Sequence, residues 1–180
     1  MKTKNSVFIA TSLDGYIADK DGGIVWLDTI PEINAIDTGY ASFTSEIDAL
    51  VMGRISFETV CGFDVEWPYT KPVFVISNSL SEIPETYKGK VELVKGTITE
   101  ILEHIHDQGH HRLYIDGGKL IQSFLREDLI DEIVITVIPV LLGAGVSLFG
   151  DLEHQLEFEC VETKLFLQAI VQNHYHRKCS

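Results

Sequence analysis

The sequence predicts an α/β fold in which helices cover both faces of a mostly parallel central sheet. Short apolar runs, typical of buried strands, alternate with segments of helical periodicity along most of the chain. Residues 133–140 form a continuous β-branched run, which indicates a central strand buried on both faces. Two strands near the C-terminus, joined by a short turn at Lys164, predict an antiparallel pair at that end of the sheet.

The expected elements follow from where these patterns begin and end. We expect an irregular stretch from the first strand to about Pro31. Thr97 or Thr99 caps a later helix that has Glu100 in its first turn. The expected strands cover residues 7–10, 49–52, 73–77, 91–94, 113–115, 133–140, 158–163 and 167–176, and the expected helices cover residues 40–46, 53–60, 98–108 and the segment after Gly118.

Composition limits the class of protein. With 180 residues and neither linker, repeat nor low-complexity tract, the chain is expected to form a single domain over residues 1–180. A net charge of −13 argues against nucleic acid and anionic membranes as partners. No apolar run approaches the ~20 residues that span a bilayer, and the first residues lack the pattern of a signal peptide. The three widely spaced cysteines fit reduced thiols, so we expect a cytoplasmic protein.

The most informative stretch is residues 113–124. A short apolar run ends at Asp116, and Gly117 and Gly118 follow before a helical pattern begins. A strand that gives way to a helix at Gly-Gly leaves unpaired amide N–H groups, and the missing Cβ atoms let a ligand approach the backbone. The arrangement suits an anion such as pyrophosphate, and it places Asp116 where open α/β sheets bind ligands. The same residues also fit a plain turn in which Asp116 only caps the helix.

Small or polar residues follow several of the expected strands. In a parallel sheet these strand ends lie at one edge, so they would line a single cleft. Gly53 and Arg54 open a second helix whose free N–H groups favour phosphate, and the arginine adds a permanent charge. Arg54 alone would also fit an exposed helix start, and no Gly-x-Gly-x-x-Gly pattern indicates a Rossmann fold. The four strand ends are Ala10-Thr11-Ser12, Gly53-Arg54, Ser77-Asn78 and Asp116-Gly117-Gly118.

The histidines do not predict a metal site. His104 projects away from the core side of its helix, and His110 and His111 lie in the turn that follows, so we expect solvated side chains. His174 and His176 alternate along a terminal strand and therefore share a face, which requires no metal to explain it.

Four motifs occur in order along the chain: SLDGYIA at 12–18, VMGRISFE at 51–58, YIDGG at 114–118, and DEI with PVLLG and LF between 131 and 149. Together they resemble the dihydrofolate reductase superfamily over roughly residues 5–176. The resemblance is to the branch that shares the C-terminal reductase domain of the bifunctional riboflavin-biosynthesis deaminase/reductase. It implies a dihydrofolate-reductase-like fold and a nicotinamide cofactor, usually NADPH, lying across the carboxyl edge of the sheet.

The resemblance also assigns residues to the cofactor. Residues 14–26 correspond to the mobile loop that closes over the cofactor in this superfamily. Asn78 stands where many relatives carry a basic residue, so NADH is not excluded. The implied contacts are Ala10 and Ile17 with the nicotinamide, Gly53 and Arg54 with the pyrophosphate or 2′-phosphate, Ser77 and Asn78 with the adenosine ribose, and Gly117, Gly118, Lys119 and Leu120 with the pyrophosphate.

On the substrate side, the riboflavin reductases carry an acid before the Gly-Gly that touches the substrate, and Asp116 holds that place. We expect Asp116 to be the polar anchor or proton relay, with Asp14 as a weaker candidate. Dihydrofolate reductases carry an acid on the helix after a Trp-containing loop, which makes Trp26 and Glu32 tentative substrate residues. The spacing does not match, and Glu32 also fits a solvated acid near a helix start.

The predicted activity is hydride transfer from NADPH to a dihydropterin or a ribosylamino-pyrimidine. Two other classes stay open. One is a non-catalytic protein of the same fold that binds a nucleotide or pterin, and the other is a phosphate hydrolase or transferase. Against the latter, the sequence shows no P-loop, metal–carboxylate cluster or Ser-His-Asp spacing. The apolar segments 133–140 and 141–146 exceed what one sheet covers, and homodimers are common in the branch, so we expect a homodimer.

Overall fold

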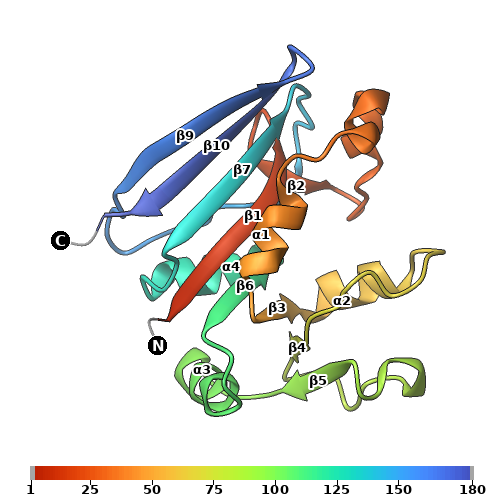
Figure 1. The fold of residues 1–180 in the computed structure, drawn as a ribbon, viewed down its shortest axis with the longest axis vertical. Coiled ribbons are helices and arrows are strands. Elements are labelled where there is room, and N and C mark those ends of the chain that lie inside the picture. The colour runs from red at the N-terminus through yellow and green to blue at the C-terminus, as the bar shows by residue number, and fades with distance from the viewer. Residues whose placement is uncertain (1–2, 179–180) are drawn as a thin grey trace.

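The computed structural model describes residues 3–178 (Figure 1). The predicted thiol Cys179 lies outside the described residues. The strands of the main sheet are β1 (Lys4–Ser12), β3 (Ala49–Gly53), β4 (Val73–Ile76), β5 (Val91–Val94), β6 (Arg112–Asp116), β7 (Glu132–Ile138), β9 (Phe158–Phe166) and β10 (Ile170–Arg177). The α-helices are α1 (Tyr40–Glu46), α2 (Arg54–Cys61), α3 (Ile98–Asp107) and α4 (Gly118–Arg126).

The eight strands follow the order β5-β4-β3-β6-β1-β7-β10-β9 across the sheet. All pairs from β5 to β7 are parallel, whereas β10 runs antiparallel to both β7 and β9. The prediction of a mostly parallel sheet with an antiparallel C-terminal pair is therefore confirmed. Parallel pairing also brings the carboxyl ends of β1, β3, β4 and β6 to the same edge.

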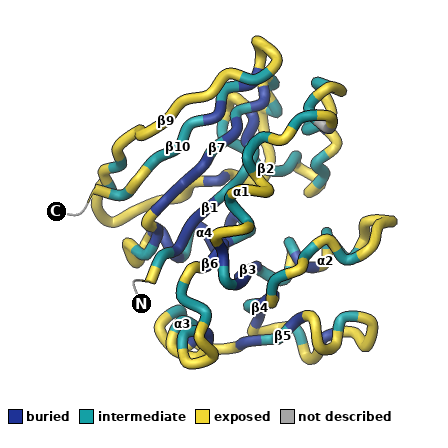
Figure 2. The backbone as a smooth tube through the Cα atoms, in the orientation of Figure 1, coloured by how far each residue is buried: buried dark blue, intermediate teal, exposed yellow. Residues whose placement is uncertain are grey.

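Helices cover both faces of the sheet, as expected. Ile105 of α3 and Phe124 of α4 belong to one core cluster, together with residues of β1, β3 and β6. Phe57 of α2 belongs to a second cluster on the opposite face, where Phe43 of α1 also packs. Figure 2 shows that β1 and β7 are buried along much of their length, whereas β9 is mostly exposed. Among residues 3–178, none of the helices has the length and apolar character needed to cross a bilayer.

Helix α3 has one of the two N-caps that its sequence predicts. The Thr97 hydroxyl accepts a hydrogen bond from the Glu100 amide, and the Glu100 carboxylate accepts one from the Thr97 amide at 2.8 Å. This reciprocal pair is a capping box, so Thr97 rather than Thr99 is the N-cap. The cap satisfies two amide N–H groups that the helix would otherwise leave free.

The stretch predicted to be irregular up to Pro31 contains regular structure. Residues Tyr16–Asp19 form β2, which pairs antiparallel with β8 (Gly145–Ser147) in a separate two-stranded sheet. Two 3-10 helices follow, η1 (Val25–Thr29) and η2 (Pro31–Ala35). The prediction was wrong here because strands this short carry little periodicity, and their pairing joins segments far apart in the chain.

The predicted turn at Lys164 was also wrong. Lys164 lies within β9 and pairs with Gln172 of β10. The chain turns instead between Phe166 and Ile170, where Leu167 and Gln168 have positive φ values of 52° and 56°. Glycine or asparagine usually marks such a left-handed turn, and neither occurs there, so the sequence held no signal for it.

Candidate active site

A cleft lies at the carboxyl edge of the sheet, where several strands end. Met52 of β3 is in register with Asp116 of β6, and Gly53 is in register with Ile76 at the end of β4. The cleft has a volume of about 580 Å³ and an apolar lining broken by a few polar groups. Its size lies within the ~300–1,000 Å³ typical of small-molecule sites.

Most of the predicted cofactor residues line this cleft. The floor is made by strand ends and helix starts, and the opposite side is made by β2 with Val146 of β8. The predicted residues that line the cleft are Ala10, Ile17, Gly53, Arg54, Asp116, Gly117, Gly118, Lys119 and Leu120.

The two helices that begin at the cleft lack side-chain caps. The N-cap of α2 is Gly53 and that of α4 is Gly117, and neither can offer a side-chain oxygen to the first amide N–H groups. Helix α3, which begins away from the cleft, has the full Thr97–Glu100 capping box. The amide N–H groups and the positive dipole ends of α2 and α4 are thus available to an anion in the cleft.

Close packing explains the two adjacent glycines. Gly117 has φ of 96°, and a Cβ atom there would lie 2.5 Å from the Ser56 Oγ atom. A Cβ atom at Gly118 would lie 2.9 Å from Ile17 Cδ1 and 3.2 Å from the Ser147 carbonyl oxygen. Helix α4 therefore begins directly against both α2 and the small β2–β8 sheet. A glycine at each position lets these three elements meet at the cleft.

Asp116 lines the cleft and is half-buried at the end of β6. Burial raises the pKa of its carboxyl group, although hydrogen bonds from Ser56 and the Gly117 amide partly oppose the shift. The carboxyl group therefore holds a proton more readily than an exposed aspartate. A raised pKa in a cleft is typical of a group that moves protons.

Three tyrosines lie near Asp116 on the α1 face of the sheet. Burial raises the pKa values of Tyr40, Tyr69 and Tyr114, and the Asp116 carboxylate raises each of them further. The Tyr114 hydroxyl donates a hydrogen bond to the Phe8 carbonyl oxygen at 2.8 Å. Asp116 thus stands between the cleft and a set of protonated phenol groups.

Arg54 reaches the cleft from the first turn of α2. Its Nη1 atom lies 2.9 Å and 3.1 Å from the two carboxylate oxygens of Glu58, one helical turn further on. Both side chains are exposed, so this ion pair contributes little to stability. The guanidinium group can therefore exchange Glu58 for a phosphate at small cost.

Two of the predicted cofactor residues lie beyond the cleft lining. Ser77 is buried, and its hydroxyl oxygen accepts hydrogen bonds from the amides of Ser79 and Leu80 at 3.2 Å and 2.9 Å. Asn78 is exposed in the same turn. Ile76, which directly precedes Ser77, is the residue of this segment that lines the cleft.

The weaker substrate candidates are also outside the lining. The Asp14 carboxylate accepts hydrogen bonds from the Ser12 hydroxyl at 2.6 Å and from the Gly143 amide at 2.7 Å, so it ties the first strand to the segment after β7. Trp26 packs against Ile138 and Ile170, and its buried indole N–H has no hydrogen-bond partner.

Glu32 is exposed in the 3-10 helix η2 and does not line the cleft. The structure thus places Asp116 alone among the four predicted acidic and aromatic substrate residues at the cleft. Glu32 stands near a helix start, the position at which a solvated acid is favourable.

The sequence reasoning missed Ser56, Tyr40 and Tyr69. Ser56 lies in the first turn of α2 and touches Asp116, and its spacing of three residues from Gly53 would have placed it at the same edge. Tyr40 begins α1 and Tyr69 lies between α2 and β4, and only the folded chain brings them near Asp116.

The sheet topology and the glycine-lined cleft at its carboxyl edge define an α/β protein with a dihydrofolate-reductase-like fold. A family model described as the RibD C-terminal domain matches residues 5–171. The chain therefore belongs to the RibD C-terminal domain family, the reductase branch that its motifs resemble. This membership supports a reductase role.

A solved structure and a curated sequence relative agree with this assignment. A putative riboflavin biosynthesis protein from Shewanella sp. PV-4 is 52% identical, with a TM-score of 0.94 over 98% of this chain and 99% of that one. The uncharacterized protein YwjB of Bacillus subtilis is 36% identical over 98% of this chain and 99% of its own length.

More distant structures share the fold. A dihydrofolate reductase from Enterococcus faecalis, complexed with NADP(H), gives a TM-score of 0.68 at 18% identity over 98% of this chain and 97% of that one. A deaminase/5-amino-6-(5-phosphoribosylamino)uracil reductase from Thermotoga maritima gives a TM-score of 0.73 at 14% identity. The match covers 98% of this chain but 57% of that bifunctional protein.

Proposed function

We propose that this protein is an NADPH-dependent reductase that transfers hydride to a small pterin-like or ribosylamino-pyrimidine-like substrate. The observation that carries the proposal is the pair of uncapped helix starts, at Gly53 and Gly117, that face one cleft beside Asp116. A dinucleotide pyrophosphate needs donors from both sides, and two helix N-termini supply them. Family membership supports the same class of reaction.

The residues present suit a nicotinamide dinucleotide. Gly53 has open space around its Cα atom, and Gly117 and Gly118 bring the α4 amides to the cleft surface. Arg54 and Lys119 supply positive charge to a chain whose net charge is −13. Arg54 would release Glu58 to bind the pyrophosphate or the 2′-phosphate, and contact with the 2′-phosphate would favour NADPH over NADH.

The chain's own contribution to the reaction is positioning, exclusion of water and movement of a proton. A bound nicotinamide would supply the hydride. Apolar side chains of Ile9, Ile17, Ile24 and Leu27 line the cleft and would keep water away from the reacting atoms. Asp116, with its raised pKa, would donate a proton to the reduced substrate, and the nearby hydroxyl groups would orient it.

A cofactor titration tests the first part of the proposal. NADPH and NADH are added to the purified protein while tryptophan fluorescence and energy transfer to the nicotinamide are followed. The Gly53→Ala variant places a methyl group in the cleft without meeting any protein atom within 4 Å. We expect it to fold normally and to bind NADPH about tenfold more weakly or worse, equivalent to ~1.4 kcal/mol.

Gly62→Ala is the matched control for this titration, because Gly62 lies at the other end of α2 and outside the cleft. Its Cβ atom would meet no atom closer than 3.4 Å. Normal NADPH binding by Gly62→Ala beside weak binding by Gly53→Ala supports the assignment. Failure of the unaltered protein to bind either nucleotide would remove the reductase proposal.

Oxidation of NADPH with a panel of dihydropterins and aminopyrimidines tests the role of Asp116. We expect Asp116→Asn to keep NADPH binding and to lose about 10²–10⁴-fold in turnover, the usual contribution of a general acid. Asp107→Asn on the exposed side of α3 is the control and should leave turnover unchanged. NADPH binding without turnover of any acceptor would favour a non-catalytic binding protein.

We also propose a homodimer. Leu165, Val171 and Val137 form an apolar row across β9, β10 and β7, and Leu165 is 63% exposed. A symmetric pair of chains would cover this row. Light scattering should give about twice the 20.2 kDa of the chain, and Leu165→Glu should return the monomer mass. A monomer mass for the unaltered protein would refute the dimer.

Residues 1–180 are proposed to act as one domain in the cytoplasm. Strands from both ends of the chain, β1 and β10, flank β7 in the same sheet, so the sheet cannot form from either half alone. Cys61 and Cys160 are unpaired thiols, as expected in a reducing compartment. Cell fractionation checks the location, and a single cooperative unfolding transition checks the domain.

A further inference from the structure

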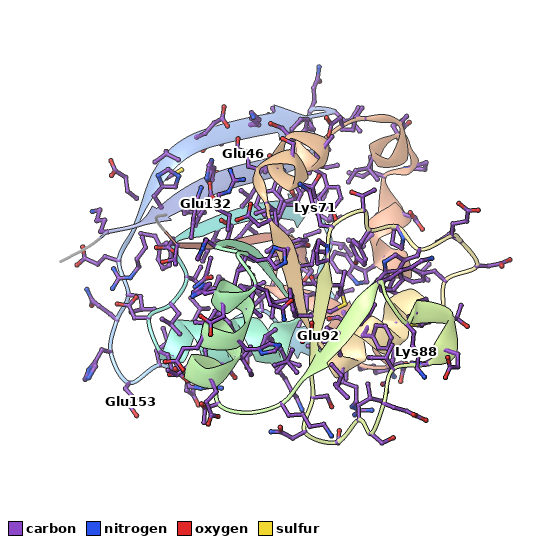
Figure 3. All side chains as sticks on the ribbon, turned by 60° about the horizontal axis from the view of Figure 1, so that its bottom comes forward. Glu46, Lys71, Lys88, Glu92, Glu132 and Glu153 are labelled. Atoms are coloured by element: carbon purple, nitrogen blue, oxygen red, sulfur yellow. The ribbon has the colours of Figure 1, made fainter. Side chains whose placement is uncertain are left out.

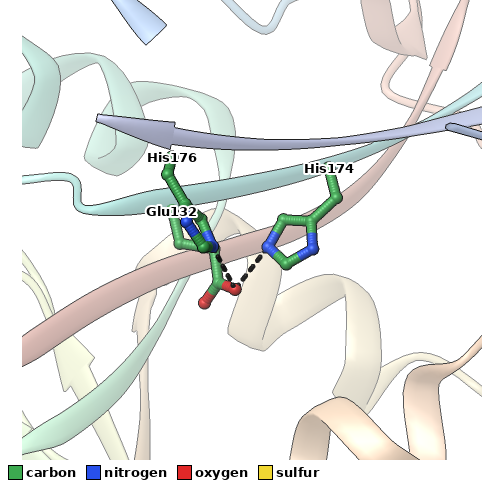
Figure 4. A group of neighbouring side chains, drawn as sticks. All are labelled: Glu132, His174 and His176. Atoms are coloured by element: carbon green, nitrogen blue, oxygen red, sulfur yellow. Dashed lines mark hydrogen bonds and ion pairs between the residues drawn. The ribbon is translucent and has the colours of Figure 1, made fainter. Parts of the chain in front are cut away.

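A second cluster of chemically active side chains lies on the α1 face of the sheet. Glu132 projects from β7, and His174 and His176 project from β10 toward it (Figure 4). One carboxylate oxygen and one ring nitrogen from each histidine all lie within 4.8 Å of one another. The cleft described above shares no lining residue with the cavity next to this cluster.

Strand register fixes the cluster. His176 is directly opposite Glu132 in the antiparallel pair, and His174 lies two residues along β10 on the same face. Ser6 of β1 is opposite Glu132 on the other side. The backbone pairing of β1, β7 and β10 therefore holds all three donor groups in place.

The two oxygens of Glu132 have different partners. The Oε2 atom accepts a hydrogen bond from the Ser6 hydroxyl at 2.7 Å and lies 2.6 Å from the Lys4 ammonium group. The Oε1 atom faces both imidazoles, with direct contact to His174 Nε2 and a separation of 3.6 Å from His176 Nε2. The contacts of Oε2 thus fix the orientation of the carboxylate, and Oε1 points toward the two histidine rings. Such outer hydrogen bonds orient the ligands of metal sites.

A cavity of about 230 Å³ adjoins the cluster, between α1 and the sheet. Glu132 and His174 line it, together with Phe8 and Phe43, and Glu46 stands at its α1 side (Figure 3). His176 is half exposed. An ion can therefore reach the cluster, and water or a small ligand can occupy the positions that protein atoms leave open.

We propose that Glu132, His174 and His176 bind a divalent transition-metal ion, with zinc the best match. Two imidazole nitrogens and one carboxylate oxygen form a donor set that zinc accepts, at bond lengths of about 2.0–2.2 Å. Tetrahedral bonds of that length put neighbouring donor atoms ~3.4 Å apart. The 3.6 Å between Oε1 and His176 Nε2 matches this spacing, whereas His174 Nε2, now in direct contact with Oε1, must move away to admit the ion. Harder ions such as magnesium prefer oxygen ligands and suit the site poorly. The bound ion would tie β10 to β7.

Metal binding is measured on untagged protein that has been freed of metal with a chelator. Zn²⁺ is followed by calorimetry, and Co²⁺ is followed by its visible ligand-field bands, which report nitrogen and oxygen ligands directly. We expect equimolar binding that raises the thermal midpoint. His174→Ala and His176→Ala should each weaken binding by more than about 100-fold, because loss of even an outer hydrogen bond costs about 10–100-fold.

Two further variants separate a metal site from a plain ion-pair network. His104→Ala is the control, because His104 contacts the Glu92 carboxylate on the protein surface without a second histidine. It should leave Zn²⁺ and Co²⁺ binding unchanged. Lys4→Met removes one of the two partners that orient Oε2 and should weaken Zn²⁺ binding by about 10–100-fold, whereas a plain ion-pair network would show no Zn²⁺ binding for this change to weaken.

The proposal is overturned if the unaltered protein gives no equimolar Co²⁺ spectrum. It is equally overturned if His174→Ala and His176→Ala bind Zn²⁺ as the unaltered protein does while circular dichroism shows them folded. These readouts do not depend on cofactor binding or turnover. The metal site and the reductase can therefore succeed or fail independently.

Discussion

Substitution of Gly117 by alanine tests the packing that forms the cleft. Gly117 has φ of 96° and ψ of 131°, a backbone region that is almost restricted to glycine. Forcing a non-glycine residue into such a region costs about 1–3 kcal/mol. The new Cβ atom would also lie 2.5 Å from Ser56 Oγ, so the serine must turn away. Its lost hydrogen bond to Asp116 adds about 1.5–3 kcal/mol, the usual value when a charged group takes part.

The summed loss for Gly117→Ala is therefore about 2.5–6 kcal/mol in the free energy of unfolding. For a domain of this size, each kcal/mol corresponds to about 2–4 °C in the thermal midpoint, so a fall of at least ~5 °C is expected. Urea unfolding measured by circular dichroism gives the free energy directly. Comparison of Ser56→Ala/Gly117→Ala with Ser56→Ala alone separates the two causes, because the hydrogen bond is absent from both and the difference is the backbone strain.

Gly53→Ala is the comparison for stability, since Gly53 has φ of −73° and open space where a Cβ atom would lie. It should change the free energy of unfolding by no more than ~0.5 kcal/mol. The reasoning is refuted if Gly117→Ala is as stable as the unaltered protein. It is also refuted if Gly53→Ala loses as much stability as Gly117→Ala.

Two further predictions concern parts of the chain outside the cleft floor. Burial disfavours the charged form of Asp48, but hydrogen bonds from Arg112 and its charge hold the pKa of Asp48 at about 2. Because this folded-state pKa is below the usual value of 3.8, the stabilisation is present at neutral pH and is lost as the pH falls from about 4 toward 2. Asp48→Asn should therefore cost about 2 kcal/mol or less at pH 7, with the gap to the unaltered protein closing in acid; a penalty that stays constant down to pH 2.5 would contradict the assignment. Gly145→Ala places a Cβ atom 2.1 Å from the Ala18 carbonyl oxygen, so it should break the β2–β8 pairing. Hydrogen exchange should then accelerate at β2 and β8 and stay slow in β1 and β7, and uniform acceleration would show that the small sheet is part of the global unfolding unit.

The sequence alone was sufficient to predict which strand ends and helix starts meet at the floor of the cleft. The strands that end at the cleft stop at residues that change the pattern, such as Gly53 or Asp116, and parallel topology then places those ends at one edge. The family motifs, which follow one another in order along the chain, supported the predicted order of the elements. Local signals also limited the cap of α3 to Thr97 or Thr99, and the structure shows Thr97.

The parts that could not be predicted depend on long-range register. The β2–β8 pair joins three- and four-residue strands from distant segments, and no local pattern marks either of them. The Glu132 cluster has the same origin: His174 and His176 were seen to share a face, but the strand opposite them was unknown. Contacts across a sheet become visible only when the pairing is known.

The two-stranded sheet over the cleft has a consequence for biosynthesis. Tyr16 pairs with Ser147, so the roof of the cleft needs both an early and a late segment of the nascent chain. At about 5–20 residues per second, a ribosome takes on the order of 6–25 s to synthesise the chain between them. Asp116 is made 31 residues before Ser147, so the strand ends at Gly53 and Asp116 are together uncovered for the last ~1.5–6 s of that time. Ligand binding must therefore begin after nearly the whole chain has emerged, and a stalled or truncated product would expose an open apolar groove to chaperones.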